Sequence, residues 1–299
     1  MAANIEHLKK YEIPGRVAVT TGNGGLAKLV ITSKSSTAEI YTHGAHITQF
    51  QKNGEPPLLF LSHKSWFAPG QPIRGGIPIC YPWFGGREGE PSHGYARLVE
   101  WQLVKTAATP DGAVTLHFAL PQVPGREAWK NLRTEFIATI ADTLTMELIS
   151  ANDACGEALQ VEACLHTYFH VGNIEATHLT GLQGAPFDDF AFGAVAAPRP
   201  AETAPLRFFQ ETNRVYPHNA STVEIHDEKL KRIVRVEKFN SQSTVVWNPW
   251  TTQKLSGDFD PAEHTDMVCV ESGSVKQDKL TLAPGQTSSL KVILSSRAA

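Results

Sequence analysis

The sequence predicts an all-β protein, a large antiparallel β-sandwich with few short helices. Its apolar runs are short and rich in Val, Ile and Thr, they alternate with polar residues, and Gly, Pro, Asn or Asp fills most gaps between them. The 299 residues are 41% hydrophobic, which is enough for one large core. No shift in composition marks a second domain, so we expect residues 1–24 to be an N-terminal extension and residues 25–299 to form a single domain.

The expected elements follow one another along the whole chain. Strand-like runs occupy residues 27–33, 36–42, 45–51, 113–120, 135–141, 143–150 and 287–296. The stretches 107–114 (AATPDGAV) and 282–287 (LAPGQT) have the composition of turns that join antiparallel strands. The best candidate for a helix is residues 126–136 (REAWKNLRTEF).

The stretch from residue 72 to residue 97 has neither a helical nor a strand period. It is rich in glycine and proline and carries Arg74, Arg87 and Arg97. Glycine permits close backbone approach and proline restricts φ, so this loop is predicted to hold a definite shape. Two interpretations remain open, a long surface connection or a rigid rim around an anionic or polyhydroxylated ligand with arginines turned inward.

The stretch 157–173 (EALQVEACLHTYFHVGN) reads as a strand with one nearly apolar face. The other face carries Cys164, His166, Tyr168 and His170, and it is either solvated or the lining of a polar cleft. On a strand, His166 and His170 would lie about 13 Å apart. Because metal–ligand bonds are about 2 Å long, we expect no metal site here.

Two further stretches are candidates for a ligand site. Glu271 ends an apolar strand just before a Ser-Gly turn, where carboxylates are usually solvated. Trp247 and Trp250 flank an Asn-Pro pair, and their indoles can pack against a sugar or fill a core.

Composition excludes several classes of function. The net charge of −3 provides no global attraction to nucleic acid or to an anionic membrane. No run approaches the roughly 18 apolar residues of a membrane helix, and the N-terminus lacks a signal-peptide core. The four cysteines are scattered without metal spacing, which favours reduced thiols in a cytoplasmic protein. Nothing in the sequence indicates an oligomeric state.

Six motifs in order resemble the hexose-6-phosphate mutarotase (glucose-6-phosphate 1-epimerase) branch of the aldose 1-epimerase family. They are Arg74-Gly75-Gly76-Ile77-Pro78, Tyr81-Pro82-Trp83-Phe84-Gly85, His93-Gly94-Tyr95-Ala96-Arg97, Leu165-His166-Thr167-Tyr168-Phe169, Trp247-Asn248-Pro249-Trp250 and Val270-Glu271. The resemblance implies the β-supersandwich (galactose mutarotase-like) fold. It also implies interconversion of the α and β anomers of a hexose 6-phosphate, a small-molecule substrate, without cofactor or metal.

Site residues are assigned by this resemblance, position by position. His166 matches the family's general acid and Glu271 its general base. The expected substrate-binding residues are Arg74, Ser92, His93, Arg97 and Asn213. Asn213 departs from the pattern, because relatives usually carry an aspartate there, and an amide lacks that charge.

Other functions stay open at this point. They are a non-catalytic carbohydrate-binding protein, a mutarotase of another hexose, and a different isomerase or lyase on a similar sandwich.

Overall fold

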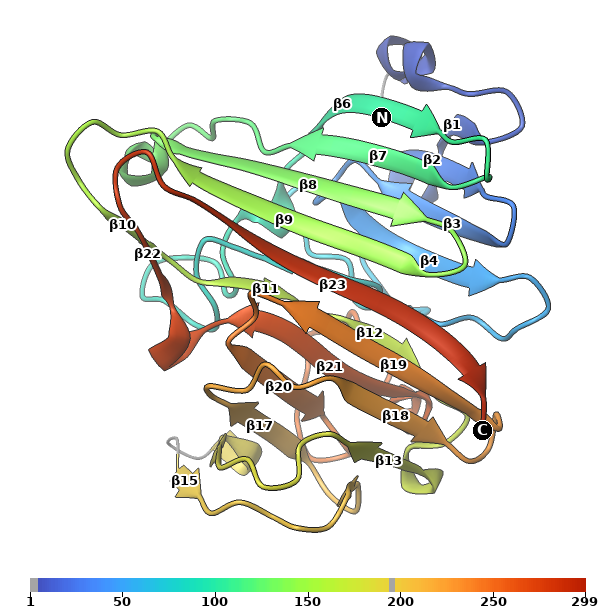
Figure 1. Ribbon diagram of the computed structural model, residues 1–299, viewed down its shortest axis with the longest axis vertical. Coiled ribbons are helices and arrows are strands. Elements are labelled where there is room, and N and C mark those ends of the chain that lie inside the picture. The colour runs from blue at the N-terminus through green and yellow to red at the C-terminus, as the bar shows by residue number, and fades with distance from the viewer. Residues whose placement is uncertain (1–4, 194–196) are drawn as a thin grey trace.

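The computed structural model describes residues 5–193 and 197–299. Its main layer is a nine-stranded antiparallel sheet that carries the longest strands (Figure 1). In spatial order this sheet contains β16 (Leu206–Arg207), β13 (Thr177–Thr180), β18 (Val223–Asp227), β19 (Arg232–Phe239), β23 (Thr287–Ala298), β9 (Leu144–Asn152), β8 (Leu132–Ile140), β7 (Val114–Ala119) and β6 (Gln102–Ala108).

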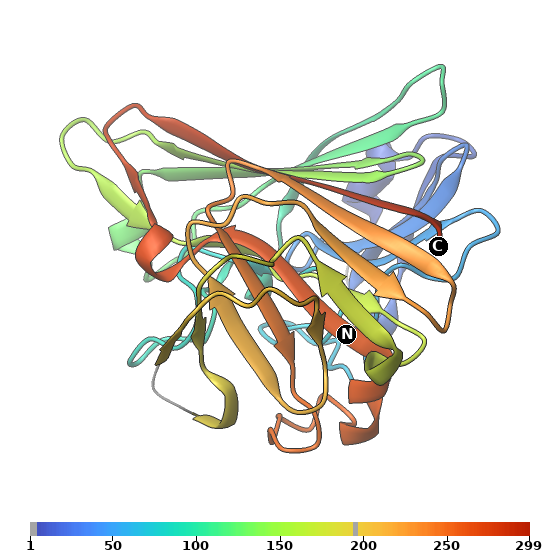
Figure 2. The ribbon, with the colours of Figure 1, turned by 60° about the horizontal axis from the view of Figure 1, so that its bottom comes forward.

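Two smaller sheets lie beneath this layer (Figure 2). The N-terminal sheet contains β1 (Val17–Thr21), β2 (Ala27–Thr32), β3 (Ser36–Tyr41) and β4 (His46–Lys52). The eight-stranded sheet contains β15 (Ala197–Arg199), β14 (Phe187–Asp189), β17 (Thr212–Tyr216), β20 (Ser243–Asn248), β21 (Met267–Ser274), β11 (Ala163–Leu165) and β5 (Ile79–Cys80), and β12 (Tyr168–His170) also pairs with β21. β10 (Leu159–Val161) and β22 (Leu280–Leu282) form a separate pair.

One apolar core joins the three larger sheets. It includes Ile40 from the N-terminal sheet, Phe136 and Leu294 from the nine-stranded sheet, and Val246 and Val270 from the eight-stranded sheet. Since side chains alternate along a strand, the opposite face of β20 and β21 is turned away from this core. The predicted all-β sandwich is therefore confirmed, and the eight-stranded sheet has a second face available for a site.

All helices within the described residues are short 3₁₀ helices. They are η1 (Glu6–Tyr11), η2 (Asn23–Gly25), η3 (Ala96–Leu98), η4 (Glu127–Trp129), η5 (Ile174–Ala176), η6 (Ala191–Gly193), η7 (Pro261–Asp266) and η8 (Lys276–Asp278). None of them is long and apolar enough to cross a membrane. The segment 5–24 supplies β1, which pairs with β2, and it packs Leu8, Val17 and Val19 into the main core.

The structure corrects three local expectations. The helix expected at 126–136 is wrong, because only Glu127–Trp129 is helical and Leu132 already begins β8. β8 pairs with both β7 and β9, and these tertiary contacts outweigh its local helical preference. Residues 282–287 do form a turn, but it leads from β22 to β23, which belong to different sheets.

The third correction concerns residues 157–173. They form three short strands, β10, β11 and β12, and the last two keep a single register against β21. The alternation of faces therefore survives although the strand is interrupted.

Candidate active site

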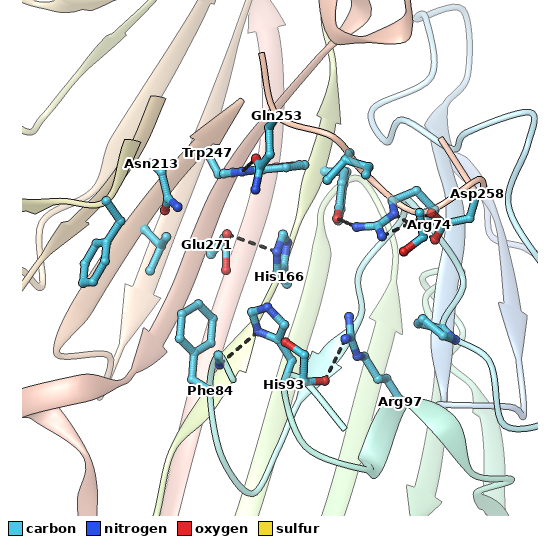
Figure 3. Close-up of a pocket in the computed structure, with 18 of the residues that line it drawn as sticks. Arg74, Phe84, His93, Arg97, His166, Asn213, Trp247, Gln253, Asp258 and Glu271 are labelled. Carbon is cyan, nitrogen blue, oxygen red and sulfur yellow. Dashed lines mark hydrogen bonds and ion pairs between the residues drawn. The ribbon is translucent and has the colours of Figure 1, made fainter. Parts of the chain in front are cut away.

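A cavity of about 480 Å³ opens on the face of the eight-stranded sheet that is turned away from the core. Ligand sites typically have volumes of about 300–1,000 Å³. The cavity brings together every site residue expected from the sequence (Figure 3): Arg74, Ser92, His93, Arg97, His166, Asn213 and Glu271. They come from β17, β21, the stretch that joins β11 to β12, the loops before β5 and η3, and η3 itself.

His166 and Glu271 are neighbours across two paired strands. Cys164 pairs with Gly273 and Tyr168 with Cys269, so the same register places His166 opposite Glu271. His166 Nε2 lies 3.3 Å from Glu271 Oε1. Both side chains are buried, at 8% and 1% exposure. An imidazole and a carboxylate therefore meet at the floor of the cavity, where each can exchange a proton with a ligand.

Burial dominates the electrostatics of this pair. Burial raises the pKa of Glu271 to about 8, although the hydrogen bond from Cys164 and the charge of Arg97 oppose the shift. Burial, followed by the charges of Arg97 and Arg74, lowers the pKa of His166 to about 3. Because the two groups touch, they titrate as a unit. Between about pH 3 and about pH 8 the pair therefore holds one proton.

A buried thiol lies behind Glu271. Cys164 Sγ donates a hydrogen bond to Glu271 Oε2 over 3.6 Å. The thiol has room because residue 273 is glycine, and a Cβ there would lie 2.9 Å from the Cβ of Cys164. Since Oε1 faces His166, both carboxylate oxygens have a partner, and these contacts restrict rotation of the carboxylate.

Arg74 lies on the His166 side of the cavity and is held by a carboxylate that the sequence analysis missed. Its Nε and Nη2 donate to the two oxygens of Asp258 at 3.1 and 3.3 Å, and its Nη1 donates to the Tyr168 hydroxyl at 3.2 Å. Asp258 is 1% exposed and also lines the cavity. Tyr168 shares the alternating face of His166, a signal present in the sequence, and the two rings stack at 4.8 Å.

The loop that ends at Arg97 passes close to the backbone of Tyr81. Gly94 has φ +75°, and a Cβ there would lie 2.0 Å from the Tyr81 carbonyl oxygen, so this crossing requires glycine. Arg97 Nη2 donates to the Ser92 carbonyl at 2.8 Å, while its buried Nε has no partner among the described residues. Arg87 instead stacks on the Trp83 ring at 5.1 Å and does not line the cavity.

His93 lies on the same loop, beside the imidazole of His166. Its ring centroid is 5.6 Å from that of His166, and its Nδ1 accepts a hydrogen bond from the Gly85 N–H at 3.3 Å. Burial and then the charge of Arg97 lower the pKa of His93 well below its usual value. A neutral ring leaves the remaining nitrogen able to contact a sugar hydroxyl.

Asn213 and Trp247 form the wall on the Glu271 side. They are paired in register between β17 and β20, and the Trp247 indole donates to Gln253 Oε1 at 2.8 Å. Trp250 does not line the cavity and packs against His264 instead. Lys276 also lines the cavity on this side, over the ring of Phe84. Neither Gln253 nor Lys276 was expected from the sequence.

His170 lies outside this cavity, in a separate depression together with Asp266. Its Nδ1 is 3.2 Å from the Asp266 carbonyl oxygen. His166 and His170 are therefore not brought together. Within residues 5–193 and 197–299, no group of three or more His, Cys, Asp or Glu side chains is arranged to hold a metal ion.

Comparison with known proteins agrees with this geometry. A family model described as aldose 1-epimerase matches residues 27–295. The chain belongs to the aldose 1-epimerase family. It is 31% identical over 283 residues to a protein of Cenchrus ciliaris with the provisional name glucose-6-phosphate 1-epimerase, covering 91% of the chain and 85% of the relative. A protein of Escherichia coli K12 with the same provisional name is 32% identical over 252 residues, 82% of each chain.

Solved structures show the same relationship. A crystal structure of a Salmonella typhimurium protein, provisionally named a mutarotase, superimposes on this chain with a TM-score of 0.86 at 26% identity and 96% coverage of each chain. A galactose mutarotase-like protein of Clostridium acetobutylicum shares the fold with a TM-score of 0.67 at 12% identity, over 95% of this chain and 98% of that one. The protein is therefore an isomerase with mutarotase activity on a small sugar.

Proposed function

We propose that the chain interconverts the α and β anomers of a hexose 6-phosphate, with His166 as general acid and Glu271 as general base. The observation that carries the proposal is the buried contact of 3.3 Å between His166 Nε2 and Glu271 Oε1 in a cavity with two arginines. The provisional names of the curated relatives also support a phosphorylated hexose.

Ring opening moves one proton through the sugar. The reacting state has the single proton of the pair on His166 and an ionised Glu271. Glu271 takes the proton of the C1 hydroxyl, O1 becomes the carbonyl oxygen, the C1–O5 bond breaks, and His166 gives its proton to O5. After rotation about C1–C2, closure on the other carbonyl face reverses both transfers. The pair therefore ends each turnover with the single proton it had at the start. Each proton-transfer group typically contributes a factor of about 10²–10⁴ to the rate.

These roles also orient the sugar. If O1 meets Glu271 and O5 meets His166, then C2 lies beyond C1 on the Glu271 side, and C5 with its phosphorylated C6 lies beyond O5 on the His166 side. Figure 3 shows Arg74 and Arg97 on the His166 side and Asn213 on the Glu271 side. The phosphate would therefore meet the two guanidiniums, which bind phosphate oxygens well. Its charge would offset the arginine charges that lower the pKa of His166.

Arg97 is better placed than Arg74 to select the phosphate, because Asp258 already takes up two of the Arg74 donors. A charge-assisted hydrogen bond contributes about 1.5–3 kcal/mol. That range corresponds to roughly ten- to hundredfold in kcat/KM. Arg97→Met should therefore lower kcat/KM for glucose 6-phosphate by this factor and change the value for glucose much less.

The proposal is tested by magnetisation exchange between the two anomeric protons in NMR, with glucose 6-phosphate at anomeric equilibrium. The protein should accelerate exchange, and Glu271→Gln and His166→Asn should each reduce the acceleration about 10²-fold or more without loss of fold. No acceleration by the parent protein rejects the activity, and a near-normal rate in either folded variant rejects that residue's role. If Arg97→Met leaves the ratio of kcat/KM for glucose 6-phosphate to kcat/KM for glucose unchanged, Arg97 does not bind the phosphate.

A further inference from the structure

A second depression of about 410 Å³, here called the annex, adjoins the catalytic cavity beyond Asn213. Phe190, Asn213 and Gln253 line both spaces. Phe192 and Glu211 also line the annex but not the catalytic cavity. The annex therefore begins on the Glu271 side, where the orientation of the sugar places C2.

The walls of the annex are fixed by a buried carboxylate. Glu211, 5% exposed, accepts the Phe192 N–H at Oε1 over 2.8 Å and the Thr252 hydroxyl at Oε2 over 2.7 Å. It joins the loop after β14 to the loop after β20. Phe192 has φ +59°, which is uncommon for a bulky residue, and its side chain is 58% exposed. The annex thus combines a fixed backbone with an open aromatic surface.

The polar groups at the junction have free donors. The Asn213 side chain makes no hydrogen bond with the described residues, and Gln253 uses its Oε1 for Trp247, which leaves its NH₂ group available. The Lys276 ammonium lies 5.9 Å from the Phe190 ring centroid and pairs with no carboxylate in the described part of the chain. A substituent that enters the annex meets the N–H donors and the Phe190 ring at the junction and the Phe192 ring beyond it. An acyl group matches this order, with a carbonyl acceptor and an apolar methyl group.

The identity of residue 213 favours the same substituent. A carboxylate accepts hydrogen bonds only, so an aspartate here would oppose an acyl carbonyl and would suit a C2 hydroxyl. An amide can donate to the carbonyl. We propose that the annex receives an acylamino group at C2, so that the enzyme anomerises 2-acylamino-2-deoxyhexose 6-phosphates as well as hexose 6-phosphates. This inference rests on the function proposed above, because the assigned roles of Glu271 and His166 determine where C2 lies.

The test compares glucose 6-phosphate with 2-acetamido-2-deoxyglucose 6-phosphate by anomeric magnetisation exchange. We expect kcat/KM for the acetamido sugar to be within tenfold of that for glucose 6-phosphate. In Asn213→Asp the ratio of kcat/KM for the acetamido sugar to kcat/KM for glucose 6-phosphate should fall at least tenfold. Gln253→Glu keeps the acceptor for the Trp247 indole but loses the NH₂ donor, so the ratio should fall there too. Phe209→Ala is the matched control, because that ring is 73% exposed and lines neither space.

The outcomes separate the two proposals. Absence of exchange with both sugars rejects the proposed function itself. Normal exchange of glucose 6-phosphate with an acetamido sugar more than tenfold slower overturns the annex proposal alone. The annex proposal also fails if Asn213→Asp and Gln253→Glu, both folded, leave the ratio where Phe209→Ala leaves it.

Discussion

Replacement of Arg74 by methionine should destabilise the protein strongly, because it strands a buried charge. Asp258 is 1% exposed, and both of its oxygens accept hydrogen bonds from Arg74. Removing one partner of a buried ion pair typically costs about 3–5 kcal/mol. With about 2.1 cal/mol/K of unfolding entropy per residue, a chain of this length has roughly 0.6 kcal/mol/K, so Tm should fall by about 5–8 °C.

The double variant separates the stranded charge from lost packing. In Arg74→Met/Asp258→Leu no unpaired carboxylate remains, and apolar replacement of a buried pair is often close to neutral. Most of the lost Tm should therefore return in a thermal unfolding scan at constant buffer and protein concentration. Arg97→Met is the control, since that guanidinium has one carbonyl partner and should cost only about 1 kcal/mol. A Tm for Arg74→Met within 2 °C of the parent, or a double variant no more stable than the single one, would refute the reasoning.

Three further predictions concern the chemistry. The exchange rate should stay level at neutral pH and decline above about pH 8, where the pair of Glu271 and His166 loses its single proton. A rate that instead rises through pH 8 would contradict a shared proton. Cys164→Ala removes a hydrogen bond that lowers the pKa of Glu271, so the alkaline decline of the rate should move to higher pH. Cys80→Ala, at an equally buried thiol, should leave the decline in place. Identical pH profiles of the two variants would show that the Cys164 thiol does not influence the pKa of Glu271. Since His166 and His170 face separate depressions, EDTA should not alter the rate. Loss of activity that zinc restores would overturn this arrangement.

The fold and most of the cavity could be predicted because their signals are local. Alternation along residues 157–173 places His166 and Tyr168 on one face, and the resemblance to the family adds Glu271, Arg97 and Asn213. The helix expected at 126–136 failed because pairing on both sides of β8 is a long-range effect.

Asp258 could not be predicted because its role depends on a partner 184 residues away. Its own stretch, QKLSGDFDPAE, is polar and has no strand period. The position of Lys276 could not be predicted for a related reason. It lies just past the last strand residue of β21, and only the folded backbone brings it over Phe84 and beside the cavity.

The register of β11 and β12 against β21 fixes the position of His166 relative to Glu271. Adjacent strands in any sheet lie about 4.7–4.9 Å apart, and pairing on both sides of the short stretch that holds His166 sets its distance from Glu271. Arg74, Ser92, Arg97, Gln253 and Lys276 lie in other connections, which do not pair with β21. Insertions or substitutions in those connections can change which sugar is accepted while the imidazole and the carboxylate keep their distance. The same strand register can therefore occur with different sugar specificities, which the connecting loops determine.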